Sequence, residues 1–187
     1  MKLLKTIFLA AFAIGFITIS DVAQGNDVKL AGKYRVVEVG ESKFKRGLEM
    51  VGREQDEYAR HLTNFALGQI QAQKGAQKSL DLARRYIGLA LHLSPKNRES
   101  VIANVQLSKG IMPKIKKKAF NKMTLATLLY VRGDTLRKQD GEANQLLAQA
   151  FVTLAAELNP MNEDAIYASA VLQQDYGKLD WNQFTGK

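Results

Sequence analysis

The feature that most limits what this chain can fold into is an internal repeat. A single shift lays residues 82–110 over residues 147–175 without a gap, and we call this correspondence the repeat register. Nine aligned pairs are identical, Pro95/Pro160 and Asn97/Asn162 among them, and several others are conservative. Such a repeat indicates one structural unit used twice. Because a unit of this size cannot bury its apolar face alone, the two copies are expected to pack on each other.

Both copies carry the apolar spacing of amphipathic helices. In the first copy, apolar residues recur three and four positions apart within residues 58–70, 80–93 and 101–107. The same order returns in the second copy, within residues 121–138, 147–158 and 163–175. Pro95 stops the second helix of the first copy, and Asn97 is the predicted amino-terminal cap of the third. The expected class is all-α, with about six to seven helices.

The amino terminus has the composition of an export signal. Lys2 and Lys5 precede an uncharged run at Thr6–Ser20, and small residues in Ala23–Gly25 predict cleavage before Asn26. The run is short for a membrane span, which needs about 20 apolar residues; a retained amino-terminal anchor is the alternative. We expect an exported protein, periplasmic or secreted, with no transmembrane span after cleavage. The chain has no cysteine, which excludes disulfides, thiolate metal sites and a lipidated cysteine.

Residues 26–47 differ from the rest of the chain. A β-branched patch at Tyr34–Val39 lies between Gly32 and Gly40, and it forms either one short strand or an extended arm on the helices. A lone strand has no pairing partner here. We therefore expect a signal peptide at 1–25, an extended or flexible arm at 26–47, a first three-helix unit at 48–110, a basic linker at 111–120 and a second three-helix unit with a carboxyl-terminal cap at 121–187.

That cap is expected to form when Leu179, Trp181 and Phe184 fold back over the last helix. A buried place in the cap is one interpretation of Trp181, and a partner contact is the other. Loss of the signal peptide removes two lysines and one aspartate, so the net charge falls from +9 to +8. A basic exported protein favours anionic surroundings such as phospholipid or wall polymer, unless the charge serves solubility alone.

Residues from about Tyr58 to Asp175 resemble degenerate repeats of the tetratricopeptide family. The residues that carry the resemblance are Ala83, Ala90, Leu93, Pro95 and Asn97 in the first copy and Ala148, Ala155, Leu158, Pro160 and Asn162 in the second. Gly68 and Gly133 resemble the glycine of the family's first helix. The family's signature tryptophan position holds Asn64 and Leu129. The resemblance implies antiparallel helix pairs that stack into a short array.

The resemblance also implies a function, which is non-catalytic binding of a protein or peptide as a scaffold. In this family the ligand lies in a groove lined by the first helices of the repeats. The positions of this chain that correspond to the groove are Phe65, Gln69, Tyr130, Asp134, Arg137 and Lys138.

The linker between the copies has the highest density of positive charge. Its lysines are Lys114, Lys116, Lys117, Lys118 and, just beyond, Lys122. They form either a solvated connector or a docking site for anionic lipid or cell-wall polymer, where each basic residue adds about 1 kcal/mol. Nucleic acid is a poor candidate partner, because the chain is exported and no aromatics are interleaved with the lysines.

Patterns typical of catalysis are missing from the sequence. His61 and His92 have no acidic or histidine partner at metal-ligand spacing. No serine sits in a nucleophile elbow, and the glycines build no phosphate loop. We therefore expect no enzyme activity, no metal and no cofactor.

Overall fold

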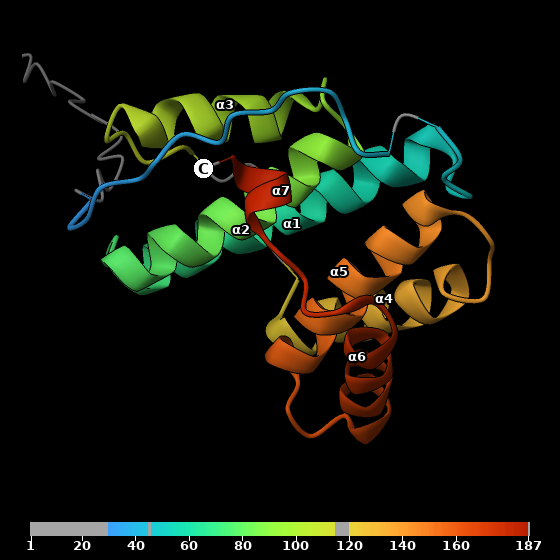
Figure 1. Cartoon of the computed structure of the whole chain (residues 1–187). Helices are drawn as coiled ribbons and strands as arrows, with labels where there is room; N and C mark the ends of the chain where they lie inside the picture. Colours follow the sequence, from blue (N-terminus) through green and yellow to red (C-terminus); the bar gives the residue numbers. More distant parts are fainter. Residues whose placement is uncertain (1–29, 45, 115–119, 187) are drawn as a thin grey trace, which may run out of the picture.

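The computed structural model describes residues 30–44, 46–114 and 120–186, and this part of the chain is all-helical with no strand (Figure 1). The predicted all-α class is confirmed. The predicted signal peptide lies outside the described residues. The helices are α1 (Gly52–Ala72), α2 (Gln77–Leu93), α3 (Arg98–Ser108), α4 (Lys122–Leu136), α5 (Glu142–Leu158), α6 (Glu163–Tyr176) and the single turn α7 (Asn182–Thr185).

The helix boundaries follow the repeat register of the sequence. α2 and α5 begin and end at corresponding positions, and α3 and α6 begin at corresponding positions. The predicted cap at Asn97 is confirmed, since its side chain accepts a hydrogen bond from the Ser100 N–H at 3.0 Å. Asn162 accepts from the Ala165 N–H at the same distance. The two copies therefore share the turn that follows their second helix.

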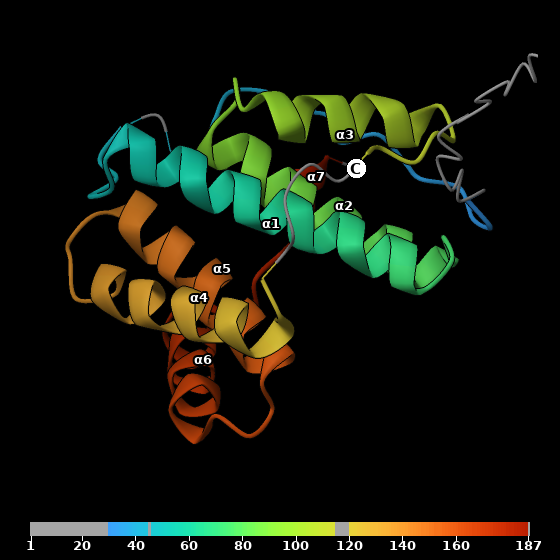
Figure 2. The same cartoon turned by 180° about the vertical axis from the view of Figure 1, so that it is seen from behind.

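The helices form layers whose order differs from their order in the chain (Figures 1 and 2). α1 and α2 form an antiparallel pair in the middle. α3 packs on one side of this pair, whereas α4 and α5 lie on the other side with α6 beyond them. A continuous stack in chain order would place α4 against α3. The layers instead make α1 and α2 the centre of the molecule.

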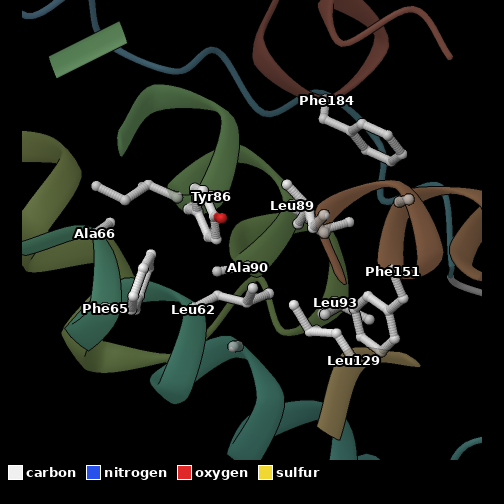
Figure 3. Close-up of a cluster of buried hydrophobic side chains, with 14 of the residues drawn as sticks. Leu62, Phe65, Ala66, Tyr86, Leu89, Ala90, Leu93, Leu129, Phe151 and Phe184 are labelled. Carbon is white, nitrogen blue, oxygen red and sulfur yellow. The ribbon is translucent and has the colours of Figure 1, made fainter. Parts of the chain in front are cut away.

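One hydrophobic core joins the two copies. Leu93 of α2, Leu129 of α4 and Phe151 of α5 lie together in Figure 3. The ring of Phe151 also lies 5.0 Å from that of Tyr58 on α1, measured between centroids. Within the second copy, a Cβ at Gly133 would lie 2.7 Å from Val152 Cγ2, so glycine lets α4 approach α5 closely.

Polar contacts tie the copies together at the edge of this core. The guanidinium of Arg132 pairs with the Glu54 carboxylate at 2.7 Å and donates to the Glu49 carbonyl at 2.6 Å. Buried Asn144, at the start of α5, accepts from the Glu49 N–H at 2.8 Å. The residues just before α1 therefore contact both α4 and α5.

The carboxyl-terminal segment differs from its expected place. It was expected on the last helix, but α7 packs against α2 of the first copy. Phe184 is fully buried there, with its ring centroid 6.0 Å from that of Phe44. A Cβ at Gly88 would lie 2.6 Å from the Phe184 carbonyl oxygen, so glycine on α2 makes room for the segment. Trp181 is half-buried, with the Arg85 guanidinium 4.2 Å from its ring centroid.

Within the described residues, every helix is too short or too polar to cross a bilayer.

Candidate functional site

The first copy binds an extended segment of its own chain. Residues 30–51 contain no helix or strand in their described part, and the stretch up to residue 44 runs alongside α3 in Figure 1. Tyr34, Val37 and Phe44 are the buried anchors of this arm. Burial of these three side chains accounts for the ordered path of a segment that has no backbone ladder of its own.

Two side-chain amides hold the backbone of the arm. The Asn104 Oδ1 accepts from the Val37 N–H at 2.9 Å, and the Asn104 Nδ2 donates to the Val37 carbonyl at 3.0 Å. Gln77 does the same for Lys33, with its Oε1 2.9 Å from the amide nitrogen and its Nε2 3.2 Å from the carbonyl oxygen. Each amide thus satisfies both backbone groups of one residue, which a strand would otherwise satisfy by pairing.

The same surface is lined by neutral, buried polar groups. The Tyr34 hydroxyl donates to Asn104 Oδ1 at 3.1 Å, and burial raises the pKa of Tyr34 far above its usual range, against a smaller opposing effect of Arg84. Burial, helped by the charge of Lys43, lowers the pKa of His92 to about 4. His92 is therefore neutral at pH 7, and its Nδ1 accepts from the Lys43 N–H at 3.2 Å.

Arg84 of α2 and Glu38 of the arm both bond the carboxyl-terminal segment. The Arg84 guanidinium donates to the Thr185 carbonyl at 2.7 Å and to the Gly186 carbonyl at 3.1 Å. Burial lowers the pKa of Arg84, and the charge of Arg35 on the arm lowers it further. The Glu38 N–H also donates to the Thr185 carbonyl, at 3.4 Å. The arm and the carboxyl-terminal segment therefore meet beside α2.

The residues expected to line one groove pack against different helices. Phe65 is 3% exposed and faces Tyr86 inside the α1–α2 pair, with the ring centroids 5.4 Å apart (Figure 3). Its side chain belongs to the core rather than to an open groove. Gln69 is half-buried one turn further along α1. Tyr130 packs instead against Val152, Ala168 and Leu172 of α5 and α6.

The structure brings the other four candidates together: Tyr130 and Asp134 lie on α4, and Arg137 and Lys138 follow directly after its end. Asp134 pairs with Arg137 and with Lys138, each at 2.6 Å. The hydrogen bond from Lys138 is the main cause that lowers the pKa of Asp134. Partial burial raises the pKa of Tyr130, and the charges of Asp134 and Asp164 raise it further. These residues form a half-exposed cluster between α4 and α6.

The linker lysines are described only at their two ends. Lys114 and Lys122 are exposed, and Lys116, Lys117 and Lys118 lie outside the described residues. Exposed apolar side chains flank the described lysines, namely Ile111, Phe120 and Met123. The ends of the linker thus combine charge with apolar surface.

No group of three histidine, aspartate or glutamate side chains converges to hold a metal ion in the described ranges. His61 lies against the ring of Phe120, 4.3 Å between centroids, and His92 is the buried acceptor already described. Both histidines thus have packing contacts.

Gln77 and Asn104 were not recognised from the sequence. Polar amides on a helix are typical of a solvated face, so their type gave no signal. A comparison of the two copies does give a signal, because both residues differ between the copies. Their counterparts in the repeat register are Glu142 and Ser169, whereas the capping asparagines are identical.

A scan against protein-family models and searches of curated proteins and of solved structures found no match to this chain.

Proposed function

We propose that this protein is an exported, non-catalytic, tetratricopeptide-like scaffold that binds a protein or peptide partner in the periplasm or cell envelope. The observation that carries the proposal is the seated arm. Two side-chain amides, Gln77 and Asn104, each bond both backbone groups of one arm residue. A helical surface with this chemistry is suited to holding polypeptide in extended form.

The α4–α6 cluster is the surface of this scaffold where we place the partner. Tyr130, Arg137 and Lys138 combine an amphipathic aromatic ring with two cations. Of these residue types, tyrosine and arginine are enriched at protein interfaces. On the adjoining helix, Tyr167 is 73% exposed. Exposed tyrosines near a charged rim offer contact area at low entropic cost.

The test is site-specific photo-crosslinking in the native cells. A benzophenone amino acid replaces Tyr130 or Tyr167, and Lys109 at the far end of α3 serves as the control position. A partner gives protein adducts at the two tyrosine positions and none at the control. Equal labelling at all three positions, or adducts at none, rejects the proposal. Amino-terminal sequencing of the same material should begin at Asn26.

A second candidate function is docking on an anionic surface through Lys114–Lys122. The exposed apolar residues Ile111, Phe120 and Met123 favour it, because apolar side chains beside lysines are typical of interfacial binding. Co-sedimentation with phosphatidylglycerol vesicles tests this candidate. Binding should fall at high salt and in the double variant Lys114→Glu, Lys122→Glu. Binding unchanged by salt and by the double variant excludes it.

A further inference from the structure

The second copy has an open groove at the place where the first copy holds the start of the arm. The groove has a volume of ≈ 640 Å³ and lies between the beginning of α5 and residues 176–183. Its lining includes Glu142, Gln145 and Gln149. Their counterparts in the repeat register are Gln77, Leu80 and Arg84.

Those counterparts lie against the arm in the first copy. Gln77 bonds the backbone of Lys33, and the side chain of Leu80 lies close to Gly32. Arg84 is near enough to Arg35 for the charge of that residue to lower its pKa, and near enough to Tyr34 for its own charge to act on the pKa of the Tyr34 hydroxyl. The position of the open groove thus corresponds to the position of an occupied one.

The two grooves differ at their far end and at the turn. Asn104 is replaced by Ser169, whose shorter side chain carries no amide, so only the stretch equivalent to residues 30–34 is repeated. Lys74 and Gly75 have positive φ in the first turn, whereas in the second turn Gly141 does, one position after the counterpart of Gly75 in the repeat register. At about 3.3 Å per residue, a segment of four or five residues spans this stretch.

The open groove is rich in hydrogen-bond acceptors. The Gln149 Nε2 donates to the Gly177 carbonyl at 2.6 Å, and the Gln145 Nε2 donates to the Gln139 carbonyl at 2.9 Å. The Oε1 atoms of Gln145 and Gln149 accept no hydrogen bond within the described residues. Three carboxylates, those of Asp140, Glu142 and Asp180, also line the groove, against one cation, Lys178.

We propose that this groove binds an extended segment of another protein that carries lysine or arginine. Backbone N–H groups of the segment donate to the glutamine oxygens, and its cationic side chain pairs with Glu142 and Asp140. The inference rests on the proposed binding function and names the chemistry of one partner segment.

The test uses the mature protein and two capped nonapeptides of alternating threonine and valine, one with two lysines and one with two glutamates. Trp181 is the only tryptophan, and its neighbours Asp180 and Gln183 face the groove or its edge. The lysine peptide should change Trp181 fluorescence and shift the amide resonances of Glu142, Gln145 and Gln149. The glutamate peptide should bind at least about tenfold more weakly.

The variant Glu142→Lys should bind the lysine peptide about tenfold more weakly, which corresponds to about 1.4 kcal/mol of binding free energy. The matched control is Glu163→Lys, since both glutamates lie in the first turn of a helix. The affinity of this control variant for the lysine peptide should be unchanged. Equal binding of both peptides, or equal effects of both variants, overturns the inference. Resonance shifts confined to Lys33 and Val37 would mean displacement of the arm instead, and would also overturn it.

Two further outcomes separate this groove from the broader function. Peptide-independent dimers in sedimentation that mask the groove would make a second copy its occupant and reject the inference. Absence of peptide binding together with crosslinks from Tyr130 rejects the groove but retains the scaffold. Absence of both rejects the scaffold as well.

Discussion

The two copies of the three-helix unit share their turns and differ in what lies against their second helices. Asn97 and Asn162 cap the third helix in the same way, and Pro95 and Pro160 end the second. Against α2 lie the arm and the carboxyl-terminal segment, whereas α5 borders an open groove. The positions common to both copies set the backbone. The positions that differ, Gln77/Glu142 among them, set what each copy can hold.

The largest expected effect breaks the core that joins the copies. Phe151→Ala and Tyr86→Ala remove counterpart rings that are both buried, and each should cost about 3–5 kcal/mol. Only Phe151 contacts Tyr58 across the two copies. Urea unfolding should therefore split into two transitions for Phe151→Ala and stay cooperative for Tyr86→Ala. A single transition with little loss of stability in Phe151→Ala would mean that the copies are not coupled through this ring.

The next effect is a pH dependence that only the first copy should show. The pKa of His92 is about 4 in the folded protein, against an ordinary value of 6.5. The folded state thus disfavours the charged ring, so stability is full above about pH 6.5 and declines as the pH falls to about 4. The loss should reach about 3 kcal/mol.

The control for this prediction is His92→Asn, which keeps an acceptor for the Lys43 N–H and removes the titrating ring. Its stability should fall less between pH 6.5 and pH 4 in denaturant titrations at each pH. An identical pH profile for the variant would show that other groups cause the acid sensitivity. The counterpart of His92 in the second copy is Glu157, which is exposed.

A smaller effect concerns the two hydrogen bonds by which the Asn104 amide holds the backbone of the arm. Asn104→Ala leaves the N–H and carbonyl of Val37 without their partners, which should cost about 1–3 kcal/mol. The counterpart change Ser169→Ala should stay within about 0.5 kcal/mol. Denaturation curves give both values, and limited proteolysis should cut the arm faster only in Asn104→Ala. Similar losses of stability in both variants would mean that the two copies do not differ in holding an extended segment at this position.

The smallest effect compares the two caps. Asn162→Ala should cost about 1 kcal/mol, the usual value of a lost amino-terminal cap. Asn97→Ala should cost more, by roughly the 0.5–1.5 kcal/mol of one further hydrogen bond. The reason is that the Asn97 Nδ2 also donates to the Asp56 carboxylate, at 2.8 Å. Thermal unfolding of both variants measures the difference, and a larger loss for Asn162→Ala would contradict it.

The helices were predictable because their signals are local. Pro95 and Asn97 end one helix and start the next within a single short turn. Asn121 was expected at the start of a helix to Lys138, and it caps α4, which ends at Leu136. The repeat register also placed Glu163 at the start of α6. Such rules act between neighbours in the chain, so one sequence suffices.

The placement of the segments was not predictable, because it depends on contacts distant in sequence. Phe184 was expected on the last helix but packs with Phe44 near Gly88 of α2. A buried aromatic residue indicates that it needs a pocket, but not which one. Gln77 and Asn104 gave even less information, since their partners are backbone groups that every residue carries. The four candidates from Tyr130 to Lys138 cluster because they are close in sequence at the end of α4, whereas Phe65 is buried within the α1–α2 pair.

Hydrogen exchange at the arm tests the central claim most directly, which is that a helical surface of the first copy holds an extended chain segment. Residues 33 and 37 lie in no helix or strand, so a free arm exchanges their amides at peptide rates. We predict strong protection of both amides in the mature protein, with the protection of Val37 lost selectively in Asn104→Ala. Exchange of both amides at the rate of a free peptide would contradict the account.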